Sequence, residues 1–220
     1  MCCSKASQYE DLKIIWNDEE LEQVEQYSYL RVSISQNRKI EEVNNRIAKA
    51  NNVYYRLNQT VIGKREVKRT TKLLIYNSVY TPTLTYGAES WVINKRIESR
   101  ITGAEMRFLR KTTGNTRRDR IRNQNIREEL KVEPLIETIE KTTLRWYGHV
   151  VRMKEERLPR KMLEVRSLGT RGKGRPRIEW EEYVEGLCTA RGKTKKDIKR
   201  LALERKEFRK WTQETRRREA

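Results

Sequence analysis

The stretch IEEVNNRIAKANNVYYRL, residues 40–57, decides the fold class. Its large apolar side chains and one alanine recur at spacings of 3, 4, 3, 4 and 3, at Ile40, Val43, Ile47, Ala50, Tyr54 and Leu57. This spacing places all of them on one stripe of a helix of about five turns. We predict that the stripe is buried and that the chain is mainly α-helical.

Upstream of this helix, apolar side chains recur at every second residue. Residues 12–16, LKIIW, alternate apolar and other side chains, and residues 27–35, YSYLRVSIS, are rich in β-branched and aromatic residues. Both patterns are typical of short strands. We therefore expect a small hairpin or meander near the N-terminus.

Downstream of Gly63, residues 65–80, REVKRTTKLLIYNSVY, predict a second helix with Leu74, Ile75 and Val79 inward. Its basic residues would then point outward: Lys64, Arg65, Lys68, Arg69 and Lys72. Pro82 cannot donate a helical hydrogen bond, so the chain should kink or start a new element there.

Three further helices follow from spacing and end signals. Ile97, Ile101, Ala104 and Phe108 mark one helix, which Gly114 can end in a left-handed conformation. Asp119 is placed to cap a short helix. Pro134 suits the first turn of a longer one. The apolar sides of these last two helices would be Ile121, Ile126 and Leu130, and Leu135, Ile139, Trp146, Val150 and Met153.

After Leu163 the composition changes. The run RSLGTRGKGRPR, 166–177, is a basic Gly/Arg/Pro loop, and the tail beyond it predicts two more helices, around Trp180 and around Phe208. Five segments result: 1–39, 40–113, 114–163, 164–179 and 180–220.

The charge of the chain is uneven. The 220 residues carry 50 Lys and Arg against 31 Asp and Glu, a net charge of +19. Residues 1–62 are nearly balanced, with 8 basic and 9 acidic side chains, whereas residues 63–220 have 42 and 22. A region this basic attracts a polyanion, since neutralised phosphates release counterions. RNA or DNA is the expected partner, and a membrane is not, because no long apolar segment is present.

Catalytic and metal-binding patterns are missing from the sequence. Cys2, Cys3, Cys188 and His149 have none of the short spacings of a zinc site, and no two of the four aspartates lie close together. The odd cysteine count and the lack of a signal peptide indicate a reduced, intracellular protein, nuclear or cytoplasmic. We expect no metal, no cofactor and no catalytic residue.

Two basic stretches are candidates for nucleic-acid binding. RRDRIRNQNIR, 117–127, offers Arg117, Arg118, Arg120, Arg122 and Arg127 near a helix start, either as phosphate contacts or as a solvated face with ion pairs. RGKGRPR, 171–177, resembles the core of AT-hook peptides and is either a groove-binding element or a flexible basic linker. Its basic side chains are Arg171, Lys173, Arg175 and Arg177. The basic residues Lys64, Arg65 and Lys68 are further candidates.

The stretch RWYGHVVRM, 145–153, holds the only histidine. His149 has four candidate roles: general base, metal ligand, nucleic-acid contact or packing residue. No second histidine, paired carboxylate or cysteine lies nearby in the sequence, which favours a hydrogen-bonded packing role. Gly148 would let another element approach. Arg145 and Arg152, about two turns apart, are the better candidates for phosphate contact.

Eight phrases in order resemble the C-terminal part of endonuclease-reverse transcriptases of non-LTR retrotransposons, notably RTE-like and related insect elements. Among them are TKLLIYNSVYTPTLTYGAESW, RFLRKTTGNTRRDRIRNQNIREEL and LRWYGHVVRM, and the likeness covers about residues 20–212. The resemblance implies that residues 9–110 are the end of the palm and the helical thumb, which grips the primer-template duplex. Residues 111–220 would then help to bind template RNA or target DNA. Arg31 stands where the family generally has glycine.

In that family the Asp pair that binds two Mg²⁺ ions lies upstream of this segment. The resemblance therefore implies a truncated remnant of an RNA-directed DNA polymerase that binds nucleic acid without catalysis. Two alternatives remain: the end of an active reverse transcriptase with an incomplete gene model, and a helical protein-interaction module.

Overall fold

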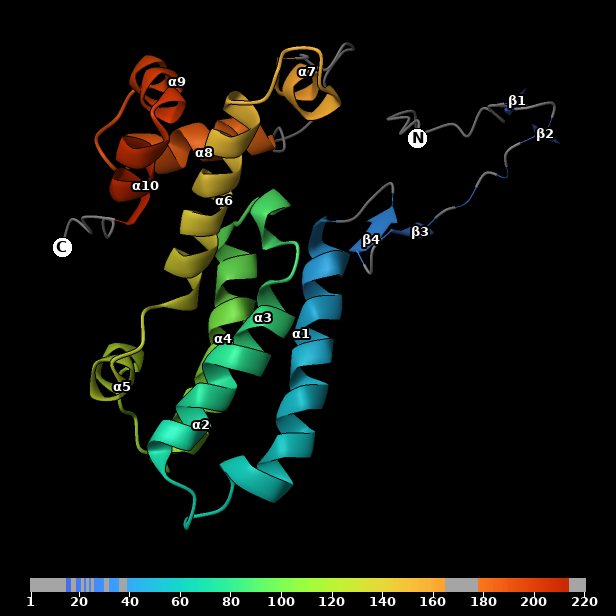
Figure 1. Cartoon of the computed structure of the whole chain (residues 1–220). Helices are drawn as coiled ribbons and strands as arrows, with labels where there is room; N and C mark the ends of the chain where they lie inside the picture. Colours follow the sequence, from blue (N-terminus) through green and yellow to red (C-terminus); the bar gives the residue numbers. More distant parts are fainter. Residues whose placement is uncertain are drawn as a thin grey trace.

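A computed structural model describes residues 15–16, 19–20, 22, 24, 26–29, 32–35, 39–164 and 178–213 of the chain. Almost all of the regular structure is helical, and the helices form a body in which a long central helix joins a lower and an upper group (Figure 1). The prediction of a mainly α-helical chain is confirmed.

Helix α1 (Lys39–Leu57) is the helix that the spacing of residues 40–57 predicts. Val43, Ala50 and Tyr54 are buried, and Ile47 and Leu57 pack partly buried against the same core. The helix runs on into a π-helical turn, η1 (Asn58–Ile62). The predicted apolar stripe is therefore the contact face of α1.

A second helical segment is continuous through Pro82. It consists of α2 (Arg69–Ile75), the π-helical turn η2 (Tyr76–Tyr80) and α3 (Thr81–Thr85). Pro82 lies in the first turn of α3, where a missing N–H is tolerated. The new element expected at this proline is therefore present, although no loop precedes it.

The predicted inward face of this segment is wrong at two of its three positions, whereas Ile75 packs partly buried against the core. Leu74 and Val79 are 66% and 42% exposed. The buried positions are instead spaced by four: Lys72, Tyr76, Tyr80 and Leu84. Around a regular α-helix such positions drift by about 40° at each step. The wider π-helical turn offsets this drift, so a prediction based on 3.6 residues per turn selects the wrong side chains.

Lys72 is buried, and the prediction that it points outward is wrong. Its Nζ donates a hydrogen bond to the carbonyl oxygen of Lys64 at 2.8 Å. Burial, and then the charges of Lys111 and Arg69, lower the pKa of Lys72. This ammonium group helps to hold the loop before α2.

Helix α4 (Lys95–Thr113) has the predicted C-terminal end and an Asn cap at its start that was not predicted. The side chain of Asn94 accepts a hydrogen bond from the Ile97 amide at 2.9 Å, and Gly114 follows the helix in the left-handed conformation, with φ 82°. A short 3₁₀ helix, η3 (Ala88–Ser90), precedes α4. Both the helix and its glycine end are confirmed.

An aromatic group at the centre joins α1, η2 and α4. The ring centroid of Phe108 lies 5.2 Å from Tyr76, 4.9 Å from Tyr80 and 6.1 Å from Tyr54. Burial raises the pKa of Tyr80, whose hydroxyl donates to the Ala104 carbonyl oxygen at 2.8 Å. These rings form the middle of a first apolar cluster, which extends from α1 to the start of α6.

Asp119 does not cap the next helix as predicted. Helix α5 (Asn123–Leu130) begins after Arg122, whereas the Asp119 carboxylate accepts hydrogen bonds from the amide and hydroxyl of Thr116 at 2.5 and 2.9 Å. These two bonds lower the pKa of Asp119. Asp119 thus closes the turn upstream of the helix.

Helix α6 (Leu135–Val151) starts directly after Pro134, one position later than predicted. Its first half contributes Leu135 and Ile139 to the first apolar cluster, and its second half contributes Leu144 and Tyr147 to a second one. The short helix α7 (Leu158–Glu164) follows. Helix α6 is the central helix that both groups share (Figure 1).

The tail forms three helices where two were predicted: α8 (Trp180–Thr189), α9 (Lys195–Leu203) and α10 (Arg205–Gln213). Glu204 has an extended conformation, with ψ 93°, and separates α9 from α10 without a glycine or proline signal. These helices pack on α6 around Val184, Ile198 and Phe208. Trp180 Nε1 also donates to the Glu89 carbonyl oxygen at 2.9 Å, which ties α8 to η3.

The described strands are short. β1 (Ile15–Trp16) pairs antiparallel with β2 (Glu19–Glu20), and β3 (Gln26–Tyr29) with β4 (Val32–Ser35). An isolated two-stranded pair is marginally stable at best in water. The expected N-terminal hairpin is therefore not supported as a β-unit of its own. None of the described helices is both long and apolar enough to cross a membrane.

Candidate nucleic-acid interface

A basic pocket lies between α6 and α10. Its volume is about 430 Å³, and it is open to solvent. We call it the arginine pocket, and its lining residues are Arg145, His149, Arg152, Arg205, Phe208 and Arg209. The volume is in the range of small-ligand sites, so a nucleotide-sized group would fit.

One wall of the pocket comes from α6. Arg145, His149 and Arg152 are four and three residues apart, so their side chains leave the same face of the helix. Seven residues at 1.5 Å each separate the outer two by about 10 Å along the axis. The prediction that Arg145 and Arg152 share a face is consistent with this arrangement.

Gly148 allows the second wall to come close. A Cβ atom at Gly148 would lie 2.3 Å from Cε1 and 2.7 Å from Cδ1 of Phe208. The Phe208 ring is buried and therefore lies directly against the backbone of α6. The close approach predicted for Gly148 is confirmed, and α10 is the approaching element.

Because Phe208 packs against α6, two arginines of the same helix, α10, lie at the pocket. Arg205 and Arg209 are four residues apart on α10 and belong with Phe208 to the lining. Four arginines from two helices thus face one another across the pocket. Arg205 and Arg209 are not among the residues predicted from the sequence, although two arginines spaced by four around a core Phe are a usable signal.

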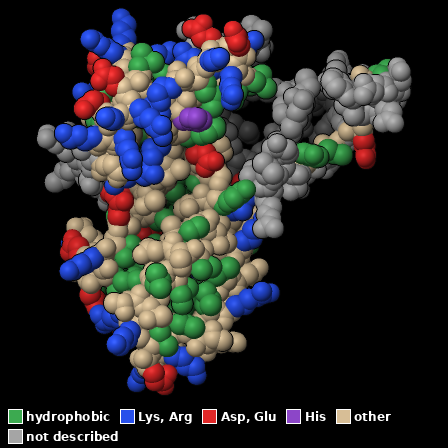
Figure 2. All heavy atoms as spheres, in the orientation of Figure 1, with side chains coloured by type: hydrophobic (Ala, Val, Ile, Leu, Met, Phe, Trp, Pro, Cys, Tyr) green, Lys and Arg blue, Asp and Glu red, His purple; other side chains and the backbone are tan. Residues whose placement is uncertain are grey.

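The charge in the pocket is only partly compensated. Arg152 donates to the Ala202 carbonyl oxygen at 2.5 Å, and burial, followed by the charge of Arg205, lowers the pKa of Arg152. The guanidinium groups of Arg145, Arg205 and Arg209 have no hydrogen bond or ion pair with a described residue, and none of the described residues that line the pocket is a carboxylate. Figure 2 shows Lys and Arg side chains gathered around the histidine on this part of the surface.

The predicted packing role of His149 is wrong. His149 is exposed and lines the arginine pocket. Its ring centroid lies 5.4 Å from that of Trp146, at an interplanar angle of 43°. Trp146, expected on the apolar side, is 38% exposed. The two rings therefore form a partly exposed aromatic pair at the edge of the pocket.

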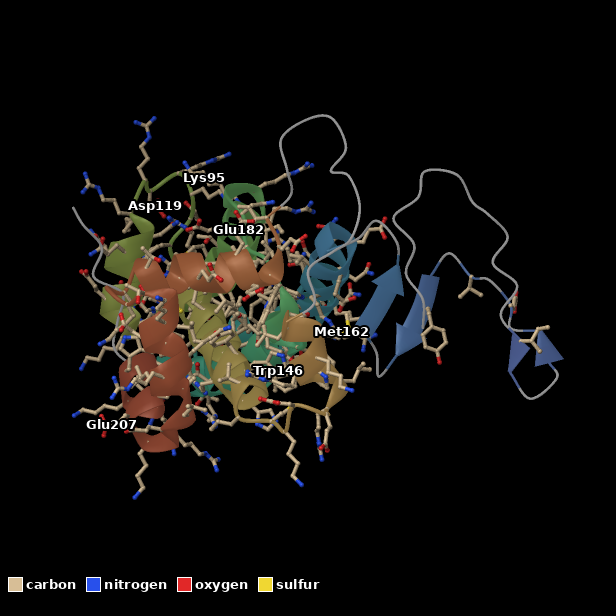
Figure 3. All side chains as sticks on the ribbon, turned by 90° about the horizontal axis from the view of Figure 1, so that it is seen from above. Lys95, Asp119, Trp146, Met162, Glu182 and Glu207 are labelled. Atoms are coloured by element: carbon tan, nitrogen blue, oxygen red, sulfur yellow. The ribbon has the colours of Figure 1, made fainter. Side chains whose placement is uncertain are left out.

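A second pocket, of about 580 Å³, lies along α4 and the loop before α5. It includes Arg117, but also the carboxylate of Glu98. Arg110 in this pocket is already bound to the carbonyl oxygens of Thr116 and Ile121. Its surface is thus less suited to an anion than the arginine pocket. In Figure 3, Lys95 of this second pocket lies on the opposite side of the molecule from Trp146.

The remaining predicted residues are not brought together. Arg118, Arg120 and Arg122 are exposed in the loop between α4 and α5, outside both pockets. The loop with Lys64, Arg65 and Lys68 lies exposed before α2, at the end of the molecule away from α10 (Figure 1). The last four candidates lie outside the described residues: Arg171, Lys173, Arg175 and Arg177.

Cysteine and metal chemistry add no second site among the described residues. Cys188 is buried, and burial raises the pKa of its thiol to about 12. Within the described part of the chain no three His, Cys, Asp or Glu side chains gather as metal ligands. Cys2 and Cys3 lie outside it.

Comparison with known proteins points to mobile genetic elements. The chain is 27% identical over 198 residues to a protein of Caenorhabditis elegans named as an uncharacterized transposon-derived protein. The match covers 86% of this chain and 70% of that protein. No protein-family model matches the chain, and no solved structure does. The similarity is consistent with a transposon origin.

Proposed function

We propose that this chain binds the sugar-phosphate backbone of RNA or DNA through the arginine pocket. The observation that carries the proposal is the convergence of four arginines from α6 and α10, with no carboxylate among the described lining residues. Arginine binds phosphate oxygens bidentately, and its charge cannot be lost at physiological pH. An anion that bridges the two helices would also relieve the repulsion between Arg152 and Arg205.

The similarity to a transposon-derived protein supports a role for this binding in a mobile element. We further propose that the chain corresponds to the C-terminal part of a non-LTR reverse transcriptase of the RTE-like type. The parent enzyme would use Mg²⁺, whereas this chain would need no cofactor. Its place would be inside the cell, in the nucleus or the cytoplasm.

The test is the double variant Arg145→Gln/Arg209→Gln, which removes one uncompensated charge from each wall. Charge-assisted hydrogen bonds contribute about 1.5 to 3 kcal/mol each, so the affinity should fall on the order of 100-fold. The slope of log K against log salt should fall by about 0.7 to 0.9 for each phosphate that the protein no longer neutralises. Fluorescence anisotropy with a labelled oligonucleotide at several salt concentrations measures both.

The matched control is Lys196→Gln/Lys199→Gln, which removes the same charge from the exposed surface of α9. It should leave the affinity within about threefold of the original. A third pair, Arg65→Gln/Lys68→Gln, examines the loop before α2. If either of these pairs weakened binding as much as the pocket pair, the pocket would not be the interface.

A protein-interaction role is the second candidate, because the lower group of helices exposes large apolar side chains (Figure 2). Tyr55, Leu74, Val79 and Tyr86 are between 42% and 66% exposed. Contiguous exposed apolar surface often marks a protein contact. A partner retained in a pull-down after nuclease treatment, and lost with Leu74→Ser, would favour this role.

A further inference from the structure

We propose that Trp146 and His149 form a stacking surface for an unpaired base beside the arginine pocket, so that the preferred ligand is single-stranded nucleic acid. This inference rests on the proposed function, because the arginine pocket must hold the phosphates. It adds a base-binding site to that backbone contact.

The aromatic pair has the required position. Trp146 and His149 are one turn apart on α6, and their ring centroids are 5.4 Å apart. His149 itself lines the pocket, together with Arg145 and Arg152. His149 therefore shares a helix face with the phosphate contacts, and Trp146 extends the aromatic surface beside that face.

Trp146 is unusually exposed for its size. At 38% exposure it exceeds the other tryptophans between residues 39 and 213, of which Trp91 and Trp211 are buried and Trp180 is half-buried. A tryptophan offers the largest aromatic face of any side chain, and exposing it costs hydrophobic free energy. Through His149, which lines the arginine pocket, this face adjoins the arginines, and aromatic faces beside basic groups are the combination that proteins use for single strands.

A duplex does not fit this combination. In a duplex, both faces of each base are covered by its neighbours in the stack, and a protein reads only the base edges in the grooves. An aromatic ring can stack only on a base that is unpaired or at an end. The phosphate contacts alone do not discriminate between the two forms, whereas the aromatic pair does.

The size of the site also indicates a short strand. Arg145 and Arg152 lie about 10 Å apart along α6. At about 3.4 Å for each nucleotide of a stacked strand, this distance corresponds to roughly three nucleotides. One base on the aromatic pair and two or three phosphates in the pocket would fill the site.

The experiment compares oligothymidylate and oligouridylate with a duplex of equal length, at one salt concentration, by fluorescence anisotropy. The original chain should bind the single strands more tightly than the duplex. Trp146→Leu keeps an apolar side chain but removes the aromatic face, and should weaken single-strand binding roughly fivefold or more. Duplex binding should change by less than about twofold.

Two further variants control for side effects. Trp146→Tyr keeps a stacking face and should retain most of the affinity. Tyr55→Leu removes an exposed aromatic side chain that also lies beside an arginine, Arg107, on the lower group of helices, and should change nothing. If Trp146→Leu unfolds the chain, His149→Leu replaces it, since His149 is exposed.

The outcomes separate the two proposals. A chain that binds neither form of nucleic acid overturns the proposed function. Binding of both forms that Trp146→Leu weakens equally, or that Tyr55→Leu weakens as much, overturns only the stacking surface. A selective loss of single-strand affinity with Trp146→Leu supports it.

Discussion

Beside the first apolar cluster, Arg127 and Arg69 are tied to carboxylates, whereas beside the second cluster several arginines face a common pocket. Arg127 contacts Glu105 at 2.7 Å and Arg69 contacts Glu129 at 2.6 Å. Arg145 and Arg209, beside the second cluster, have no such partner among the described residues. An arginine thus has a structural role where it meets a carboxylate, and is available to a ligand where several arginines converge with no described carboxylate among them, as in the arginine pocket.

Net charge does not show this difference. Residues 39–144 carry 22 Lys and Arg against 12 Asp and Glu, whereas residues 145–164 and 178–213 carry 16 against 10. The lower group therefore has the larger excess of positive charge. A binding surface is located by charges that the fold leaves uncompensated, and only the three-dimensional arrangement reveals these.

The largest expected effect is the loss of stability in Glu105→Ala, which removes a structural partner of an arginine beside the first cluster. Glu105 is fully buried, and its carboxylate binds the Arg127 guanidinium and the Leu135 amide. Removing one partner of a buried ion pair costs about 3 to 5 kcal/mol, because the other charge stays buried. Urea denaturation followed by circular dichroism should show this loss, while the folded variant keeps its affinity for nucleic acid.

The double variant Glu105→Leu/Arg127→Met serves as the control for this change. It replaces the ion pair with apolar side chains, which is often neutral or stabilising. Most of the lost stability should return. A double variant as unstable as the single one would show that the charge of Arg127 was not the cause.

A smaller effect is expected from Gly148→Ala, which acts on the second cluster. The new methyl group would meet the buried ring of Phe208 and push α10 away from α6. Overpacking of this kind costs about 1 to 3 kcal/mol. Thermal unfolding should show the loss, and nucleic-acid affinity should fall with it because Arg205 and Arg209 move.

Gly186→Ala is its matched control. Gly186 lies inside α8, and a Cβ atom at this position would meet no other atom within 4 Å, so alanine fits. Alanine in a helix interior is about 0.5 to 1 kcal/mol more favourable than glycine. If both alanine variants were stabilising, the close contact between α6 and α10 would be disproved.

The smallest expected losses of stability come from removing the N-caps of two helices, one in each group. Asn94→Ala removes the cap of α4 in the lower group, and Thr194→Ala removes the cap of α9 in the upper group. Each loss should be about 1 kcal/mol at neutral pH. The free energy of unfolding of each variant, measured by chemical denaturation across a pH series, distinguishes the two caps.

Of the two variants, only Thr194→Ala should cause a loss of stability that depends on pH. Hydrogen bonds from the hydroxyl and amide of Thr194 lower the pKa of Asp197. The folded state therefore holds this proton less firmly, so the stabilisation is present above the unfolded pKa of about 3.9 and is lost as pH falls through the lower folded value. The cost of Thr194→Ala should shrink in acid, and that of Asn94→Ala should not.

Much of the helical fold could be predicted because regular spacing and end signals determine it locally. The helix from Ile97 to Phe108, with Asn94 and Gly114 at its ends, is such a case. The buried face with Tyr76 and Tyr80 could not, because a π-helical turn changes the period. The break at Glu204 has no local signal, since neither glycine nor proline marks it.

The candidate site was predictable only in part. Arg145 and Arg152 could be paired from their spacing on one helix. Arg205 and Arg209 could not be joined to them, because they are more than 50 residues away and reach α6 through tertiary packing alone. The spacing of His149 places it beside the apolar stripe and so predicts packing, but the side of a helix that remains open depends on its neighbours.

Helix α6 belongs to both apolar clusters along its 17 residues. If its middle turns opened, the packed faces of both clusters would separate together. The two groups of helices therefore unfold as one cooperative unit, and the central amides of α6 exchange with solvent only when the whole body opens. Ligand binding at the upper end of α6 would accordingly slow hydrogen exchange in the lower group, which touches no ligand.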